Sequence, residues 1–515
     1  MNEIALAPVA VLLAAPLLTA LLSAATNHPF VLRALNLGTM TALALSEAVI
    51  VGDLSGHGAI TTLWGLVYLD GLSAFILLII IAIGCTASVY SWDYLADHVA
   101  RGTIAPGRTR LFFCLFHLFL FAMIVATLAN SLGVLWVAME GTTLATAFLI
   151  SFFRTREGLE AGWKYLILCS VGIALALFGT VLMYYSSVRV LGDVSAALNV
   201  TILQQVASQL DPQVLKLAFI FVLVGYGTKI GLAPMHSWVP EAYGEAPAPV
   251  VAMLAGVLET VAVYALLRTK SIVDQAVPDY YTGNLLLLLG LLSFVVAALF
   301  ILIQHDYKRM FAYSSIEHMG IAIAGFGVGG PAGTFGGLFH LLNHALAKSL
   351  AFFAAGNIHR RFGTREIQEV HGMASVQPIT ALAVLIAGLA LAGMPPFSMF
   401  LSEMLVLSSL ATQSFASDTL HLGRFITLII AHDVRNLAVV LLFLLFAVAL
   451  FGGFIYRVVL MVWGTAPRDV PSGERWSVSH IPLAVTALAL IGLGWAIPEP
   501  VKGLMDQAVI VLLGR

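Results

Sequence analysis

Long apolar segments separated by short polar ones run along almost the whole chain. A helix needs about 20 apolar residues to cross the hydrocarbon core of a bilayer, and by this rule the chain contains about 14 membrane-spanning helices. The predicted spans are 4–25, 31–51, 66–91, 111–129, 131–153, 162–188, 214–232, 248–268, 283–304, 311–329, 333–357, 378–409, 437–464 and 480–497. A short amphipathic stretch follows at 499–513. The pattern predicts an all-α polytopic membrane protein.

The composition supports this prediction. Hydrophobic residues make up 60% of the chain and charged residues only 10%, whereas a soluble globular chain carries about 25% charged residues. The mean hydropathy is +0.97. The net charge of −2 gives no reason to expect nucleic acid as a partner. No loop is long enough for a soluble domain of typical size, so we expect soluble chemistry to belong to other subunits.

The sequence shows no recognisable motif for a nucleotide, metal or other cofactor. It has no CxxC, no Walker A motif and no GxGxxG in a convincing context. Cys85, Cys114 and Cys169 lie in apolar segments without paired spacing, which favours small core residues over a zinc or iron–sulfur site. The N-terminus has no basic region before its apolar stretch, which argues against a cleaved signal peptide.

The lysines and arginines are distributed unevenly between alternate loops. One set of loops carries Arg33, Arg101, Arg108, Arg110, Arg154, Arg156, Lys164, Lys308, Arg309, Arg360, Arg361, Arg365, Arg457, Arg468 and Arg475. The opposite set carries Arg189, Lys216, Arg268, Lys270, Arg424, Arg435, Lys502 and Arg515. Cytoplasmic loops are richer in basic residues, so the first set is predicted to be cytoplasmic. Both termini would then lie on the periplasmic side of a bacterial inner membrane.

Two segments of the chain echo each other. Residues 231–238 and 392–399 share a core of small residues followed by proline, and each has a charged residue nearby, Lys229 and Glu403. Proline interrupts a helix because it removes a donor and clashes with the preceding turn. The seventh and twelfth spans are therefore predicted to be broken. An offset of five alternating spans places the two segments in opposite orientations, which indicates inverted repeats of a transporter type.

Lys229 lies in an apolar run, 217–234, that is long enough to cross a bilayer. A lysine at such a depth costs about 2.5–3.5 kcal/mol on insertion scales, so it normally faces a partner or a water-filled path. Glu140 in the fifth span is its predicted ion-pair partner, and a change in that pair would alter the affinity of the lysine for a proton. The alternative for Glu140 is a carboxylate at a helix end that reaches the interface.

His340, His344 and Lys348 are spaced four residues apart, which puts all three on one helical face. A proton wire is the favoured interpretation, because a neutral imidazole both donates and accepts hydrogen bonds near physiological pH. The alternatives are a metal site, for which no adjacent carboxylate motif is present, a haem ligand, and a structural polar seam between helices.

Further ionisable residues lie in the later spans. Glu259 lies deep in the eighth span, where a lone carboxyl is expected to be protonated, and its alternative is a neutral group that hydrogen-bonds a neighbouring helix. Glu317 and His318 open the tenth span, and their alternative is an interfacial pair near the headgroups. Glu403 follows the break in the twelfth span, where freed backbone carbonyls need partners. It is placed to exchange protons with an aqueous exit, and its alternative is a helix-capping acid.

Four segments resemble the antiporter-like subunits of respiratory complex I: 164–168, 227–242, 246–250 and 312–320. The same superfamily includes the Mrp cation/proton antiporters and the membrane arms of energy-converting hydrogenases. Within it, the segments 314–320, 339–348 and 355–358 look most like hydrogenase-4 component F. The resemblance covers residues from about 110 to 410 and is most specific in the seventh span.

The resemblance implies 14 helices, inverted five-helix repeats and a hydrated polar axis halfway across the membrane. It assigns the pairing carboxylate to Glu140 and the central lysine to Lys229. It assigns the later relay to His340, His344 and Lys348 and the exit acid to Glu403, and it implies no cofactor in this chain. Two positions depart from the pattern, since Glu259 stands where a lysine or histidine is usual and Glu317 adds an acid before His318.

These observations divide the chain into four regions. Residues 1–110 would hold helices 1–3, 111–270 the first repeat, 283–464 the inverted second repeat, and 480–515 the C-terminal helix and tail. We expect a non-catalytic, proton-translocating subunit of a hydrogenase-4-like or complex I-related respiratory complex, assembled with other membrane and peripheral subunits. The alternatives are an Mrp-type cation/proton antiporter subunit, a passive membrane scaffold and a haem-binding quinone cytochrome.

Overall fold

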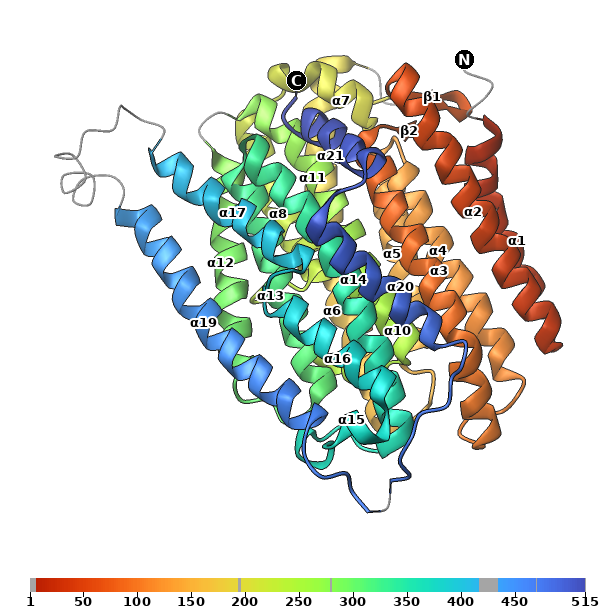
Figure 1. The fold of residues 1–515 in the computed structure, drawn as a ribbon. Helices are drawn as coiled ribbons and strands as arrows, with labels where there is room; N and C mark the ends of the chain where they lie inside the picture. Colours follow the sequence, from red (N-terminus) through yellow and green to blue (C-terminus); the bar gives the residue numbers. More distant parts are fainter. Residues whose placement is uncertain (1–5, 193–195, 278–279, 416–433, 469, 515) are drawn as a thin grey trace.

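Long helices arranged side by side dominate the computed structural model (Figure 1). The structure describes residues 6–192, 196–277, 280–415, 434–468 and 470–514. The first half contains α1 (Leu6–Ala25), α2 (Pro29–His57), α3 (Gly71–Ala100), α4 (Arg108–Leu128), α5 (Leu132–Ile150), α6 (Arg156–Leu191), α7 (Val200–Val206), α8 (Pro212–Ile230), α9 (Trp238–Glu245), α10 (Ala248–Met253) and α11 (Glu259–Ala276).

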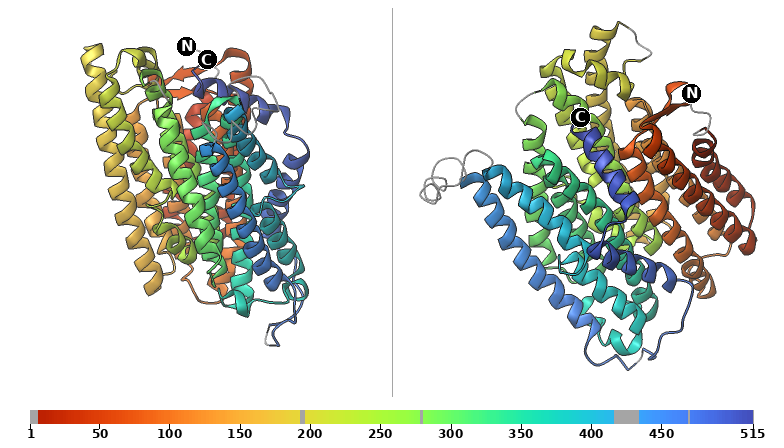
Figure 2. Two further views of the ribbon diagram at one scale, coloured as in Figure 1. Left: turned by 90° about the vertical axis from the view of Figure 1, so that its left-hand side faces the viewer. Right: turned by 45° about the horizontal axis from the view of Figure 1, so that its top comes forward.

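The second half contains α12 (Tyr281–Ile301), α13 (Tyr307–Val328), α14 (Gly330–Phe362), α15 (Met373–Val376), α16 (Pro378–Leu391), α17 (Ser398–Phe415), α19 (Val434–Val462), α20 (His480–Trp495) and α21 (Glu499–Leu512). The first turn of α1 and the helix α21 lie at the same end of the bundle (Figures 1 and 2). The all-α polytopic fold predicted from the sequence is confirmed.

The described residues include 11 helices long and apolar enough to cross a membrane, or up to 12 if the bent pair α20–α21 is one span. Each predicted span overlaps a helix, but the count of 14 stays a prediction. The helix α13, which carries Lys308, Arg309 and Glu317, is not among the 11. The predicted twelfth span consists of two shorter helices, α16 and α17.

The start of the predicted third span was wrong. Val67–Leu69 forms the strand β2, which pairs antiparallel with β1 (Ile60–Thr62). The helix α3 begins only at Gly71, because Asp70 caps it: the carboxylate accepts a hydrogen bond of 2.9 Å from the backbone N–H of Ser73. An N-cap residue has extended backbone and satisfies a free N–H of the first turn.

Both predicted helix breaks are present. The helix α8 ends at Ile230, where Gly231 takes a left-handed conformation with φ of 81°, and the next helix begins only at Trp238. In the same way, residues 392–397 separate α16 from α17. The eighth span carries an irregularity that the sequence did not predict. Leu254–Leu258 is π-helical and directly precedes Glu259, and such π-bulges occur frequently at functional sites.

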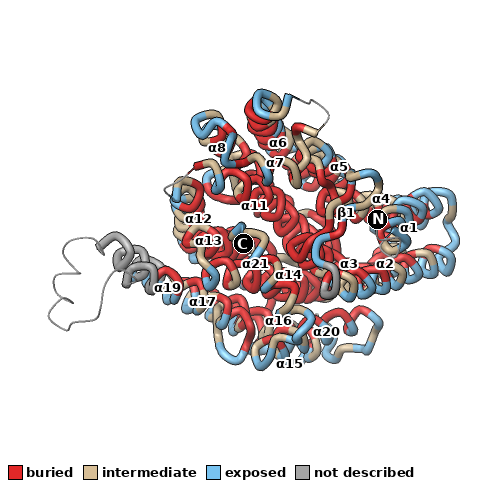
Figure 3. The backbone as a smooth tube through the Cα atoms, turned by 90° about the horizontal axis from the view of Figure 1, so that it is seen from above, coloured by how far each residue is buried: buried red, intermediate tan, exposed pale blue. Residues whose placement is uncertain are grey.

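The helices α11 and α14 occupy the centre of the bundle, whereas α1 and α2 lie at its edge with exposed faces (Figure 3). Glycines allow close approach of two outer helix pairs. Gly172 and Gly225 bring α6 against α8, and Gly290 and Gly320 bring α12 against α13; a Cβ at Gly290 would lie 2.6 Å from the carbonyl oxygen of Gly320. Small residues are typical of packed helices in membranes, because dispersion contacts between helices replace the hydrophobic effect there.

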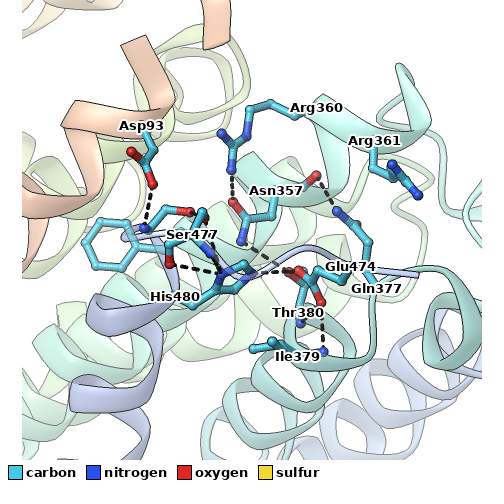
Figure 4. Close-up of polar contacts among 12 residues, drawn as sticks. Asp93, Asn357, Arg360, Arg361, Gln377, Ile379, Thr380, Glu474, Ser477 and His480 are labelled. Atoms are coloured by element: carbon cyan, nitrogen blue, oxygen red, sulfur yellow. Dashed lines mark hydrogen bonds and ion pairs between the residues drawn. The ribbon is translucent and has the colours of Figure 1, made fainter. Parts of the chain in front are cut away.

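The segment between α19 and α20 crosses the end of the bundle opposite to α21 (Figure 1). Glu474 in this segment caps the N-terminus of α16. The N-cap residue of that helix, Gln377, makes no capping hydrogen bond with its own side chain. The carboxylate accepts from the backbone N–H groups of Ile379 and Thr380 at 2.8 and 3.0 Å, and from His480 at 2.9 Å (Figure 4). A carboxylate at a helix N-terminus also complements the helix dipole. Glu474 therefore fastens the segment to α16.

Glu474 should make stability depend on pH. Burial alone would raise the pKa of Glu474, but the hydrogen bonds from His480 and Thr380 outweigh burial and lower that pKa. A lowered pKa in the folded state means that the group stabilises the fold above its unfolded pKa, about 4.3, and that this contribution is lost as the pH falls through the folded value. Glu474→Gln should therefore cost about 1–3 kcal/mol at pH 7, the usual cost of disrupting buried hydrogen bonds.

Thermal unfolding of the purified protein between pH 7 and pH 3 measures this effect. The difference between wild type and Glu474→Gln should shrink as the pH falls. Glu369→Gln, which changes an exposed carboxylate that precedes α16 in the chain, is the control and should match the wild type. A constant difference at every pH would show that the charge of Glu474 is unimportant.

Candidate functional site

Lys229 lies fully buried at the C-terminal end of α8, just before the break. Its ammonium donates to the backbone oxygen of Met139 at 3.0 Å and to the hydroxyl of Thr143, both on α5. The carboxylate of Glu140 accepts from Thr143 at 3.2 Å and from Ser170 on α6 at 2.8 Å. Glu140, Thr143, Ser170 and Lys229 are called the Lys229 cluster below.

The predicted direct ion pair between Glu140 and Lys229 is not formed. Thr143 stands between them, because residues 140 and 143 share a face of α5 and the hydroxyl reaches both partners. The ammonium of Lys229 is thus stabilised by the carbonyl of Met139 and the hydroxyl of Thr143. The carboxylate of Glu140 contacts this hydroxyl and not the ammonium itself. Both residues are nevertheless brought together, as the sequence predicts.

The break after Lys229 has its own polar partners. The carbonyl oxygen of Thr228 accepts from the indole N–H of Trp238 at 2.7 Å and from the backbone N–H of Gly231 at 3.2 Å. The N–H of Ala233 donates to the hydroxyl of Ser293 at 2.9 Å. Irregular backbone at membrane depth is tolerated only where protein or water satisfies it, and here side chains of the neighbouring elements do so.

The helix α14 carries His340, His344 and Lys348, all fully buried, on one face. Lys348 repeats the arrangement of Lys229: its ammonium donates to the backbone oxygen of Phe311 at 2.9 Å and to the hydroxyl of Ser314, both on α13. Lys229 and Lys348 therefore each use one carbonyl and one hydroxyl of a single neighbouring helix.

His318 on α13 contacts His340 on α14, with Nδ1 of the first 3.2 Å from Nε2 of the second. The other nitrogen of His318 donates to the carbonyl oxygen of Leu391 at the end of α16, at 3.1 Å. Glu403 on α17 completes the group, since its carboxylate lies 3.8 Å from Nδ1 of His318. The break in the twelfth span thus supplies both a freed carbonyl and an acid to the histidines.

Glu259 lies fully buried beside the π-helical segment. The hydroxyl of Tyr243 on α9 donates to its carboxyl group at 2.5 Å, and Nε2 of His344 lies 3.8 Å from its second oxygen. Sequence reasoning missed Tyr243, although its place just after the broken span was a usable signal. Glu259, His318, His340, His344 and Glu403 are called the histidine cluster below.

Glu317 and Lys348 flank the histidine cluster. Glu317 is 7% exposed and interacts electrostatically with Glu403 and Lys348. His318 is fully buried, so the two residues that open the tenth span face the interior of the bundle rather than lipid. All nine sequence-predicted residues therefore lie in the two clusters or directly beside the second one.

Aromatic rings separate the two clusters. Tyr165, Trp238 and Tyr243 are in edge contact in that order, with ring centroids 5.0 and 5.9 Å apart. The ammonium of Lys229 lies 6.0 Å from the ring centroid of Tyr165. Within the described residues, no direct hydrogen bond joins the Lys229 cluster to the histidine cluster. The rings of Tyr165, Trp238 and Tyr243 are called the aromatic partition below.

Two buried basic residues were wrongly counted with the loops. Arg268 lies within α11 and forms a two-pronged ion pair with Asp70, at 2.5 and 2.6 Å, while its guanidinium lies 4.9 Å from the ring centroid of Tyr264. Lys308 is buried at the start of α13 and donates to the backbone oxygens of Gly244 and Ala246 at 2.9 and 3.1 Å. Both residues bind partners inside the protein and do not lie free in loops. They therefore cannot be counted when the cytoplasmic side is inferred from basic loop residues.

The contact between Tyr243 and Glu259 gives a direct test of the histidine cluster. Tyr243→Phe removes the hydroxyl but keeps the ring against Trp238, so the infrared carboxyl band of Glu259 should shift while the protein stays folded. The band is identified by its loss in Glu259→Gln. Tyr226→Phe, at another buried tyrosine, serves as the control and should leave the band in place. An unchanged band in Tyr243→Phe would contradict the contact.

Comparison with known proteins identifies the family of this arrangement. The model of the family described as "NADH:quinone oxidoreductase/Mrp antiporter, TM" matches residues 129–431. This range includes every residue of both clusters.

Among curated proteins, the chain is 42% identical over 345 residues to a hydrogenase-4 component F homolog from Methylacidiphilum infernorum, covering 67% of this chain and 72% of that protein. It is 31% identical over 408 residues to NADH-quinone oxidoreductase subunit N from Desulforudis audaxviator, covering 78% of each. Among solved structures, a chain of the membrane-bound sulfane sulfur reductase, an archaeal respiratory membrane complex, has a TM-score of 0.83 at 23% identity, covering 98% of this chain and 97% of that one.

Proposed function

Because the chain belongs to the NADH:quinone oxidoreductase/Mrp antiporter transmembrane family, we propose that it is the proton-translocating membrane subunit of a hydrogenase-4-like or other complex I-related respiratory complex. It is a multi-pass membrane protein of a family that is typically found in the bacterial inner membrane. The redox reaction takes place in partner subunits, and this chain couples that reaction to proton transfer. Its relatives are subunits of multi-subunit complexes, which supports a hetero-oligomer.

The observation that carries the proposal is the chain of buried ionisable groups inside the bundle. Ionisable residues are rare in membrane spans and normally mark ion pathways or proton relays. Here they contact one another or backbone carbonyls, and none of the two lysines and three histidines is exposed. Protons would pass from Glu140 through Thr143 to Lys229, cross the aromatic partition, and continue in the histidine cluster.

The order of the second half of the route follows from the contacts. Tyr243 and Glu259 receive the proton beyond the aromatic partition, and His344 lies next to Glu259. The pair His318–His340 follows, and Glu403 at the break releases the proton. Lys348 and Glu317 set the local charge beside this route. Histidine suits such a relay because its ring nitrogens both donate and accept.

The aromatic partition gives the route a point of control. Moving one charge across a potential of 100 mV takes about 2.3 kcal/mol, so a continuous wire would let protons run back down the gradient. An aromatic partition between Lys229 and Tyr243 that opens only when the partner subunits react would prevent this leak. Rearrangement of a buried charged group involves free energies of similar size.

The orientation and the repeats are part of the proposal. The start of α1 and the helix α21 share one end of the bundle (Figure 1), and four arginines line a cavity of about 480 Å³ at the other end, where Figure 4 shows two of them, Arg360 and Arg361. The four arginines are Arg101, Arg360, Arg361 and Arg475. Basic residues favour the cytoplasmic side, which supports periplasmic termini. The matching breaks after α8 and α16 support inverted repeats at 111–270 and 283–464.

Lys229→Ala tests the proposal in the reconstituted complex. Loss of the ammonium interrupts the Lys229 cluster, so the partner subunits should keep most of their redox turnover while proton uptake per electron falls at least about tenfold, as expected when one relay group is lost. Uptake is measured with a pH-sensitive dye enclosed in proteoliposomes. Lys216→Ala is the matched control, because Lys216 lies on the same helix but near its start and is not fully buried.

The same assay separates the alternatives. Unchanged proton uptake in Lys229→Ala, with a folded complex, would identify a passive scaffold. An Mrp-type antiporter subunit would instead show flux that depends on sodium, so the assay is repeated with sodium replaced by potassium. The histidine cluster supplies nitrogen donors, whereas sodium prefers oxygen ligands, and uptake should therefore be the same in both salts.

A further inference from the structure

Three donor groups from three helices converge in the histidine cluster. One nitrogen each of His318 and His340 and one carboxylate oxygen of Glu403 all lie within 4.8 Å of one another. The closest pair of nitrogens is 3.2 Å apart, and the nitrogen of His318 is 3.8 Å from the carboxylate. Ligand atoms at the usual 2.0–2.1 Å from a tetrahedral Zn²⁺ are about 3.3 Å apart. The two nitrogens already have about this spacing, and the carboxylate oxygen must move closer to both for the three donors to bind a single ion.

The hydrogen bonds around His318 fix which of its nitrogens is free. The carbonyl oxygen of Leu391 only accepts, so Nε2 of His318 must carry the hydrogen of that bond. In the neutral ring, Nδ1 then presents a lone pair toward His340 and Glu403. This is the form of imidazole that ligates a metal.

His340 presents a second lone pair because the hydroxyl hydrogen of Ser402 is donated to another residue. The hydroxyl of Ser402 lies 2.8 Å from the backbone oxygen of Met399, to which it donates. Its oxygen then accepts from Nδ1 of His340 at 3.0 Å, which leaves Nε2 of His340 without a hydrogen and aimed at His318. Two lone pairs and a carboxylate face one point, and a cation between them would bind all three.

The surroundings of the two histidines resemble the outer shell of a metal site. Ligating histidines almost always donate their second N–H to a carbonyl, a carboxylate or water, which fixes the ring and its tautomer. Leu391 fills this role for His318 and Ser402 for His340. Asn343 holds Ser402 in turn through a hydrogen bond of 3.1 Å. The rings are thus oriented without the ion.

The break in the twelfth span connects the group to the surface. Both histidine side chains are fully buried, but the side chain of Glu403 is 15% exposed. Its carboxylate lies against Gly393 within the break, where Pro395 and Pro396 are exposed. An ion reaching this break meets the carboxylate first and the imidazoles behind it.

The neighbouring charges also accommodate a divalent ion. Glu317 interacts electrostatically with Glu403, so a second acidic group lies beside the three donors. The nearest ammonium, that of Lys348, is bound to Phe311 and Ser314 on α13. His344 lies behind His318, with ring centroids 6.0 Å apart. Imidazole ligands favour zinc, copper or nickel over hard cations such as Mg²⁺.

We propose that His318, His340 and Glu403 form a binding site for a divalent transition-metal ion, represented by Zn²⁺, with water as the fourth ligand. The bound ion occupies the lone pairs that would otherwise carry the proton, and it therefore blocks the relay at its exit. The binding site stands on the geometry of the three donors alone. Only the block rests on the proposed function.

Zinc binding is measured on the purified, metal-depleted complex, and X-ray absorption at the zinc edge identifies the ligand atoms. One ion per chain with two nitrogen ligands is expected. His340→Gln and Glu403→Gln should each weaken binding at least about tenfold, and Ser402→Ala, which removes only the partner of His340, should weaken it by about 10–100-fold. His117→Gln is the matched control, since His117 is a buried histidine bonded to Asn36 on other helices.

Binding that is unchanged in His340→Gln, Glu403→Gln and Ser402→Ala would overturn the site. Because Ser402→Ala is a small change, it keeps the test valid if a ligand variant does not fold. Proton uptake with and without Zn²⁺ then separates the two proposals. Inhibition that needs a higher Zn²⁺ concentration in Ser402→Ala, a variant that keeps every group of the relay, supports the block. Zinc bound at the three residues with uptake unchanged would leave the site intact and remove the relay from this cluster.

Discussion

The absence of water from the hydrocarbon core of a bilayer is the constraint on which this structure depends. A buried ammonium there must find its partners within the protein. Lys229 and Lys348 meet this requirement in the same way, each with one backbone carbonyl and one hydroxyl of a neighbouring helix. Neither has a carboxylate as its direct partner. Neutral partners stabilise the charge without fixing it, so each lysine remains able to exchange a proton, which a tight buried ion pair would oppose.

Arg268 shows the opposite solution. Its guanidinium is bound by both oxygens of Asp70 and by Ser73, and it packs on the ring of Tyr264. A two-pronged pair of this kind is strong and geometrically specific, and arginine does not lose its proton in proteins. This pair joins α3 to α11 as a fixed connection. The same membrane environment thus holds one kind of buried charge for structure and another for transfer, and the partners distinguish the two.

The sequence predicts what depends on position along one helix. Apolar runs indicated the spans, the small-residue and proline segments indicated both breaks, and a spacing of four residues put His340, His344 and Lys348 on one face. Contacts between helices could not be obtained in this way, because periodicity does not state how one helix is rotated against the next. The contact of His318 with His340, the hydroxyl of Thr143 between Glu140 and Lys229, and the role of Tyr243 therefore appear only in the structure. The π-helical turn before Glu259 has no local sequence signal either.

The two broken helices provide hydrogen-bond partners near both clusters. A continuous helix satisfies its own carbonyls and offers none to a side chain, whereas a break leaves them free. The carbonyl of Leu391 is free for this reason, and by accepting from His318 it turns the other nitrogen of that ring toward His340 and Glu403. The break after α8 acts differently, because Trp238 caps the carbonyl of Thr228 and its ring joins the aromatic partition between the clusters. One break thus orients the ring of His318, and the other contributes Trp238 to the rings that lie between the two clusters.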